Sequence, residues 1–288
     1  MSRGARVCRR ITRRHAKTFY LASHGLPRSV RAHAYSVYGF CRWADDGVDC
    51  ARNVTEATQR LDGARAALDA AYGVGTLPAG LGEFRETVQI CGIPKRLFLD
   101  LLDGMAMDLT ITRYADFAEL DLYCYRVAGV VGLMMAHVFG FRNDRCLPHA
   151  VTLGTAMQLT NILRDVGEDF ARGRIYLPLD EMRQFGVTEH QIGEGHADGP
   201  FRDLMRFQIA RARRYYDDAQ RGIPDLVGAS SRLTVRLMGR MYGGILGEIE
   251  RLDLDVFQAR ASVPMRRKLA IAARCGVATW AEMMMRTT

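Results

Sequence analysis

The sequence of 288 residues contains no CxxC pair, no apolar run long enough to span a membrane and no alternating strand pattern. Its seven cysteines are scattered and odd in number, which argues against a zinc site and a disulfide framework and favours a reducing compartment. The longest apolar stretch, 127–141, is shorter than the roughly 20 residues of a spanning helix. Because this stretch also contains His137, we expect it to form a buried core helix.

Other absences restrict the fold. There is no internal repeat and no linker that would separate domains. The glycine-rich segment 73–82 lacks the GxxxxGK[ST] motif and follows no strand, so we interpret it as a surface loop. The N-terminus is basic with no apolar run behind it, so no secretory signal is expected. The sequence therefore predicts one all-α domain over residues 1–288.

The charge is basic: 40 lysines and arginines against 32 aspartates and glutamates give a net charge of +8. This sign is typical of proteins that bind nucleic acid, a membrane surface or a small anionic substrate. Residues 1–17 are predicted to form a basic helix in which Val7 and Ile11 recur at helical spacing, as in a solvated first helix or one that lies on anionic lipid. No aromatic residues alternate with its arginines and no nucleic-acid motif is present, so no nucleic-acid partner is expected.

Residues 158–169 carry the strongest chemical signal. On a helix of 3.6 residues per turn, four polar side chains share one face, namely Gln158, Asn161, Asp165 and Asp169. Unpaired polar groups are costly to bury, so something in a cavity is expected to satisfy this face. Carboxylates four residues apart point the same way and can bridge divalent cations, while amide oxygens complete the oxygen shell.

A second carboxylate pair with the same spacing, Asp45 and Asp49, occurs far upstream. Tyr38 and Arg42 fall on the same helix face, and Arg42 could neutralise a phosphate there or simply pair with Asp45 or Asp46. Either acidic pair alone is more often a solvated helix face. The two together predict a small Mg²⁺ cluster, which suits a diphosphate leaving group.

Four motifs in this order resemble the squalene/phytoene synthase family of head-to-head prenyl transferases. They are the segments 42–49 (RWADDGVD), 123–132 (YCYRVAGVVG), 158–165 (QLTNILRD) with Asp169, and 173–178 (GRIYLP). The resemblance runs from about Lys17 to Leu269. It implies an isoprenoid synthase bundle of helices around a central cavity, which agrees with the all-α prediction.

The resemblance also implies roles for individual residues. Mg²⁺, or Mn²⁺ in its place, would be held by Asp45, Asp49, Asn161, Asp165 and Asp169. Tyr176 and the four aspartates would form the catalytic set. Substrate would contact Thr18, Phe19, Tyr38, Arg42, Tyr123, Val127, Val131, Gln158, Asn161, Arg164, Tyr242 and Arg260. Ala16 departs from the family pattern, because many relatives have a serine there, and Thr18 is then the only hydroxyl at this place.

A third stripe, Tyr123, Val127 and Val131, belongs to a helix predicted over 119–140. Such a stripe usually packs in a core, but it could also form the wall of an isoprenoid tunnel. Gly129 and Gly132 would let another helix or a ligand approach this segment closely. The side chains at the floor of such a tunnel are not located by the sequence.

The activity that the resemblance implies is phytoene synthase, which condenses two geranylgeranyl diphosphates 1′-1 through a cyclopropylcarbinyl diphosphate. The alternative is a C30 enzyme that makes presqualene diphosphate, squalene or dehydrosqualene from two farnesyl diphosphates, and NADPH is expected only for a squalene-type enzyme. The segment 16–20 (AKTFY) looks more like phytoene synthases. No dinucleotide motif and no C-terminal anchor of the eukaryotic squalene synthase type is recognised.

Other classes fit less well. Terpene cyclases and head-to-tail synthases share Asp-rich metal sites but lack the motif from Asn161 to Asp169 followed by Arg-Ile-Tyr-Leu-Pro. A non-catalytic basic helical protein that binds lipid or nucleic acid would need no acidic pairs. The resemblance further implies a cytoplasmic enzyme that is peripheral at the inner face of the membrane and passes its product to a phytoene desaturase.

Overall fold

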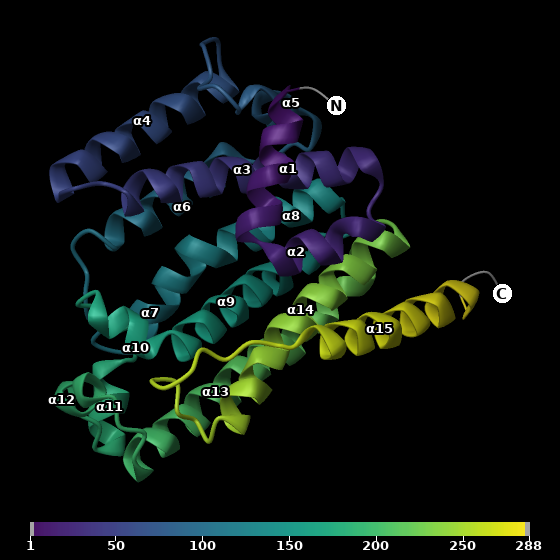
Figure 1. Ribbon diagram of the computed structural model, residues 1–288. Coiled ribbons are helices and arrows are strands. Elements are labelled where there is room, and N and C mark those ends of the chain that lie inside the picture. Colours follow the sequence, from purple (N-terminus) through teal and green to yellow (C-terminus); the bar gives the residue numbers. More distant parts are fainter. Residues whose placement is uncertain (1–2, 286–288) are drawn as a thin grey trace.

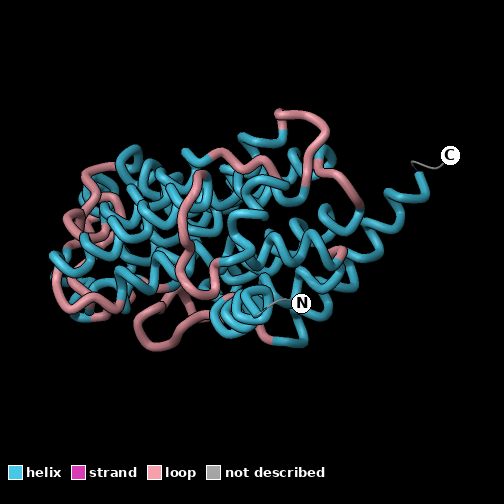
Figure 2. The backbone as a smooth tube through the Cα atoms, turned by 90° about the horizontal axis from the view of Figure 1, so that it is seen from above, coloured by secondary structure: helices cyan, strands magenta, loops and turns pink. Residues whose placement is uncertain are grey.

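The structure, a computed structural model, describes residues 3–285, and every regular element in that range is a helix (Figures 1 and 2). One isolated bridge joins Phe141 to Leu226. The prediction of an all-α fold is therefore confirmed. The α-helices are α1 (Arg3–His15), α2 (Lys17–Ala22), α3 (Arg28–Asp49), α4 (Val54–Tyr72), α5 (Gly82–Ile90), α6 (Lys95–Met107), α7 (Phe117–Cys124), α8 (Val130–Phe139), α9 (Cys146–Arg164), α10 (Val166–Ala171), α11 (Leu179–Phe185), α12 (Glu189–Glu194), α13 (Gly199–Ala219), α14 (Ala229–Arg251) and α15 (Met265–Met285).

The N-terminal basic helix ends earlier than predicted, at His15, because Ala16 leaves the helical conformation before α2 begins. The face of this helix that packs inward carries Cys8 and Thr12. Cys8 and Thr12 are 2% and 0% exposed, whereas Val7 and Ile11 are only partly buried. Cys8 packs against Gly39 of α3, where a Cβ atom would lie 2.8 Å from the Cys8 sulfur. The arginines from Arg6 onward in α1 are exposed and thus lie on its outer face.

Residues Phe117–Phe139 form one continuous helical stretch of 23 residues, longer than the apolar run in the sequence. By length and composition it could cross a membrane, but 44% of its most apolar window is buried inside the molecule. A π turn, η2 (Tyr125–Gly129), lies at its centre between α7 and α8. π turns insert one residue into a helix and often mark functional sites.

Helix α9 lies against this stretch at backbone distance. A Cβ atom at Gly132 would lie 2.1 Å from the Ala150 carbonyl oxygen, and one at Gly154 would lie 2.2 Å from that of Ala128. Only glycine permits such an approach. The predicted role of Gly132 in close helix approach is confirmed, and the contact places α9 beside the Tyr123 stripe.

The segment 158–169 is not one helix, so that prediction was wrong. Helix α9 ends at Arg164, Asp165 takes φ −108° and ψ 16°, and α10 begins at Val166. Aspartate and glycine are poor helix formers. Gly167 also packs against Phe257, since a Cβ atom added at Gly167 would lie 3.2 Å from the Phe257 ring. The Asp169 N–H still donates to the Asp165 carbonyl oxygen at 2.8 Å, so the two carboxylates keep their helical spacing.

Two large apolar clusters form the core. The first contains Phe40 from α3, Phe84 from α5 and Phe98 from α6, with ring centroids 4.3–5.4 Å apart. The second joins α9 and α13 to the segment that carries Tyr176. Residues of both clusters line the central cavity described next, so the cavity lies between the two halves of the chain.

Candidate active site

A cavity of about 460 Å³ lies between α3, α6, the stretch from α7 to α8, α9 and α14. Many residues predicted to contact substrate line it: Phe19, Tyr38, Arg42, Tyr123, Val127, Val131, Gln158, Asn161 and Tyr242. Asp45 lines it as well. Thr18, Asp49, Arg164, Asp165, Asp169, Tyr176 and Arg260 do not belong to its lining. The Tyr123 stripe therefore faces a cavity, as the tunnel-wall interpretation expects.

The first acidic pair stands at the polar end of this cavity, which we call the mouth. Arg42 donates from Nη1 to Asp45 Oδ2 at 2.8 Å and also pairs with Asp46. Burial and the nearby charge of Asp49 together raise the pKa of Asp45 to about 6, although Arg42 opposes both. Arg42 thus makes the intrahelical ion pair that the sequence left open, and it holds the carboxylate next to the cavity.

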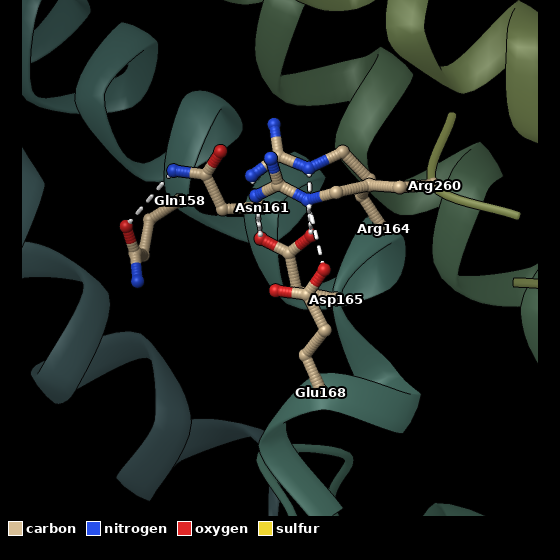
Figure 3. A network of polar contacts seen from close by, with 6 residues as sticks. All are labelled: Gln158, Asn161, Arg164, Asp165, Glu168 and Arg260. Carbon is tan, nitrogen blue, oxygen red and sulfur yellow. Dashed lines mark hydrogen bonds and ion pairs between the residues drawn. The ribbon is translucent and has the colours of Figure 1, made fainter. Parts of the chain in front are cut away.

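At the second acidic pair, two arginines converge on one carboxylate (Figure 3). Arg164 Nε donates to Asp165 Oδ1 at 2.8 Å, and Arg260 donates from Nε and Nη2 to the two oxygens at 2.9 and 3.0 Å. Arg260 also pairs with Glu168 at 3.2 Å. Burial alone would raise the pKa of Asp165, but these hydrogen bonds outweigh it and lower that pKa.

Asp169 lacks comparable partners. Burial and the charge of Asp165 raise its pKa to about 7, because Arg172 and Arg174 only partly compensate. On the cavity side, the Asn161 amide donates to Gln158 Oε1 at 3.4 Å (Figure 3). The polar face predicted around Asn161 therefore exists, although the helix breaks within it.

The donor chemistry at the mouth suits a hard divalent cation, because it offers carboxylate and amide oxygens. The raised pKa values of Asp45 and Asp169 reflect burial and like-charge repulsion, which a bound cation would relieve. Within residues 3–285, no three His, Cys, Asp or Glu side chains lie close enough together to hold a metal ion. Arg42 holds Asp45, and Arg164 and Arg260 hold Asp165, while the predicted metal ligands stay predictions.

Asp108 lines the cavity and was not identified from the sequence. Tyr123 donates to its Oδ2 at 3.1 Å, Tyr176 donates to its Oδ1 at 2.8 Å, and Arg174 donates to its carbonyl oxygen at 3.0 Å. Burial raises the pKa of Asp108, and the hydrogen bond from Tyr176 opposes that shift. A signal was present: Asp108 ends an apolar helix, where the helix dipole disfavours a carboxylate.

The other end of the cavity, which we call the floor, is largely apolar. It is formed by Met135, Phe139, Cys146, His149, Ile223, Leu226 and Val235. At a rise of about 1.5 Å per residue, the part of α9 from Cys146 to Asn161 spans about 22 Å from floor to mouth. His149 is held there by Asp218, with 3.0 Å between Nδ1 and Oδ2.

The comparisons with known proteins agree with this arrangement. The family model described as squalene/phytoene synthase matches residues 12–267. A 15-cis-phytoene synthase of Synechocystis is 39% identical over 91% of this chain and 81% of its own length. A phytoene synthase of Arthrospira platensis is 40% identical over 91% of this chain and 89% of its own.

Solved structures give the same picture. A dehydrosqualene synthase crystallised with a ligand superposes with a TM-score of 0.87 at 29% identity, covering 96% of this chain and 97% of its own. The squalene synthase of Alicyclobacillus acidocaldarius gives 0.81 at 30% identity, covering 88% and 95%. The isoprenoid synthase fold implied by the sequence motifs is thereby confirmed.

Proposed function

Since this chain belongs to the squalene/phytoene synthase family, we propose that it is a phytoene synthase, a prenyltransferase that joins two geranylgeranyl diphosphates head to head. The observation that carries this proposal is an apolar cavity whose mouth bears two acidic motifs and three arginines. This arrangement suits a substrate with a hydrocarbon chain and a diphosphate head. The relatives at 39–40% identity named as phytoene synthases support the C20 substrate.

At the mouth, Arg42, Arg164 and Arg260 can turn from carboxylate to diphosphate oxygens, which they bind through paired N–H donors. Release of the arginines frees the carboxylates for a cation. Asp45, Asp49, Asn161, Asp165 and Asp169 would hold it. Bound Mg²⁺, or Mn²⁺, withdraws charge from the leaving diphosphate oxygen.

Inside the cavity, aromatic rings face the place where the hydrocarbon chains react. Tyr38, Tyr123 and Tyr242 line it, and burial raises the pKa of each phenol. The phenols therefore stay neutral, so no phenolate is present to trap an allylic cation. Their ring faces stabilise positive charge. The apolar surroundings keep water from the cyclopropylcarbinyl intermediate.

A second candidate is the C30 reaction on two farnesyl diphosphates. It is favoured by the structural likeness to squalene and dehydrosqualene synthases at 29–30% identity. Sequence identity is higher to the phytoene synthases, so we place the C20 reaction first. The proposed C20 reaction needs no NADPH.

The experiment that tests these two reactions uses purified protein with Mg²⁺ and either geranylgeranyl or farnesyl diphosphate, each with and without NADPH. Products are identified by mass spectrometry. A C40 hydrocarbon from geranylgeranyl diphosphate without NADPH is expected. A C30 product alone would replace the proposal with the second candidate, and the absence of any hydrocarbon would reject both.

We also propose that the enzyme lies at the cytoplasmic face of an anionic membrane, where its product can pass to a phytoene desaturase. The outer face of α1 supports this proposal, because Arg9, Arg10, Arg13 and Arg14 are exposed while Cys8 packs inward. Charge reversal of these four arginines is expected to abolish sedimentation with phosphatidylglycerol vesicles. Unchanged sedimentation would refute the role of α1.

A further inference from the structure

A second cavity, of about 650 Å³, lies between α13, α14 and α15, which run beside one another in Figure 1. We call it the arginine cleft. Leu153, Ala219, Ile223 and Val235 line both this cleft and the active-site cavity. Only these side chains, among the described residues, line both spaces. The cleft is therefore a separate space with one shared wall.

Glycines line the cleft where α14 faces α9 and α13. A Cβ atom at Gly243 would meet the ring of Tyr216 at 3.5 Å, and one at Gly239 would meet Leu153 at 3.5 Å. These are ordinary van der Waals distances, so packing does not require glycine at either position. Because glycine has no side chain, neither Gly239 nor Gly243 fills the cleft that it lines.

Arginines from three helices line this space. Arg213 comes from α13 and pairs with Glu250, Arg236 and Arg240 come from α14, and Arg274 comes from α15. Arg240 donates to the neutral amide of Gln220 at 3.2 Å, and Arg274 has no hydrogen bond or ion pair with the described part of the chain. Among the described lining residues, Asp217 is the one acid. The cleft consequently carries an excess of positive charge.

The positive charge of the arginines is felt inside the cleft. Burial raises the pKa of the Cys275 thiol at the base of the cleft, and the charges of Arg240 and Arg236 oppose that shift. Beside this charge lies an apolar surface made by Ile223, Leu246 and Ile271. Positive charge next to an apolar surface is complementary to a molecule with an anionic head and a hydrocarbon chain.

We propose that the arginine cleft binds a phosphate-bearing amphiphile, with its phosphate on Arg240 and Arg274 and its hydrocarbon chain against Leu246 and Ile271. Guanidinium groups bind phosphate through paired N–H donors, which favours phosphate as the head group. The shared chemistry fits both a membrane phospholipid and a prenyl phosphate. Since the cleft shares a wall with the active-site cavity, an occupant would press on Leu153 and Val235 and change the affinity for substrate.

The binding experiment uses the full chain and soluble dihexanoyl phosphatidic acid, followed by calorimetry. The test variant is Arg240→Gln/Arg274→Gln, and the matched control is Arg142→Gln/Arg183→Gln, which removes the same charge at two exposed positions that line neither cavity. Binding that is lost in the cleft variant and kept in the control is assigned to the cleft, because Arg240 and Arg274 do not line the active-site cavity. We expect the test variant to bind about tenfold more weakly or worse, and the control to bind like wild type.

Equal affinity of wild type and the cleft variant would overturn the proposal. Equal binding of inorganic phosphate would also overturn it, because the hydrocarbon chain would then contribute nothing. Geranylgeranyl monophosphate in place of the lipid distinguishes the two sources: the ligand that binds more tightly and loses more in the cleft variant is the natural class. This binding does not depend on the proposed phytoene synthase activity. A protein that makes no hydrocarbon can still pass or fail the test.

Discussion

At the mouth of the active-site cavity, charged side chains face one another, whereas about 22 Å away along α9 the floor is mostly hydrocarbon. The mouth is electrostatically unfavourable without a ligand, since the pKa of Asp45 rises to about 6 and that of Asp169 to about 7. The floor buries Phe139, Ile223 and Leu226, which favours folding. The proposed chemistry thus takes place at the mouth, where repulsion between carboxylates is unfavourable. The hydrocarbon chains would be recognised at the floor, where apolar burial is favourable.

Among substitutions that test this contrast between mouth and floor, Asp45→Asn should have the largest effect on activity. It removes a predicted cation ligand but no core contact, so turnover should fall about 10²–10³-fold while the circular dichroism spectrum is unchanged. The control is Asp46→Asn, which removes the neighbouring partner of Arg42. We expect the control to lose much less activity. Wild-type turnover of Asp45→Asn at saturating Mg²⁺ would reject the assignment of the mouth.

Asp108→Asn should have the next largest effect. An amide offers one oxygen where the carboxylate accepts from both Tyr123 and Tyr176, so the two phenols lose their common anchor. We expect kcat to fall about 10–10²-fold with KM nearly unchanged, because Tyr123 lines the cavity in which the hydrocarbon chains would react and does not bind the diphosphate. Asp103→Asn on the same helix, where Asp103 pairs with Arg65, serves as the control. A rise in KM without loss of kcat would place Asp108 outside the reaction.

Much of the fold follows from local patterns. The helix predicted over 119–140 is observed as the continuous helical stretch Phe117–Phe139, and Asp45 and Asp49 share the helix α3 as their spacing predicts. The π turn at Tyr125–Gly129 and the break at Asp165 were not predicted. At Asp165 the structure brings in Arg260, which lies 95 residues away in the chain, and no periodicity records such a contact.

The candidate site divides in the same way. The acidic pairs were found because their spacing repeats on a helix, and Asp45 does line the cavity. Asp108 and His149 each stand alone in the sequence. Tyr176, which donates to Asp108, lies 68 residues away, and Asp218, the partner of His149, lies 69 residues away. A lone polar residue has no spacing to interpret. Such residues become visible only when distant helices are brought together.

The floor is tested by His149→Phe. The larger ring should shorten the space for a hydrocarbon chain, because His149 of α9 lines the floor and packs against Gly222, where an added Cβ atom would lie 2.6 Å from the His149 Cβ atom. We expect the ratio of kcat/KM for C20 over C15 diphosphate to fall about fivefold. His149→Ala should leave or raise that ratio. An unchanged ratio in both variants would show that the chains end before the floor.

The smallest expected effect concerns stability, and it separates the mouth from the rest of the molecule most cleanly. The folded-state pKa of Asp169 lies near 7, above its ordinary value of 3.8. Folding therefore favours the protonated carboxyl. The contribution of Asp169 to stability is fully present below about pH 4 and is lost as the pH rises through about 7.

Asp169→Asn should for this reason raise the Tm of the metal-free protein at pH 8 by on the order of 2 °C, and by nothing measurable at pH 4. Calorimetry at the two pH values checks this difference. Mg²⁺ with an unreactive diphosphate analogue should stabilise wild type more than the variant, since the variant has lost both the repulsion and a predicted ligand. A variant that is less stable than wild type at pH 8 would mean that Asp169 is held by favourable contacts, and the electrostatic contrast between mouth and floor would then be wrong.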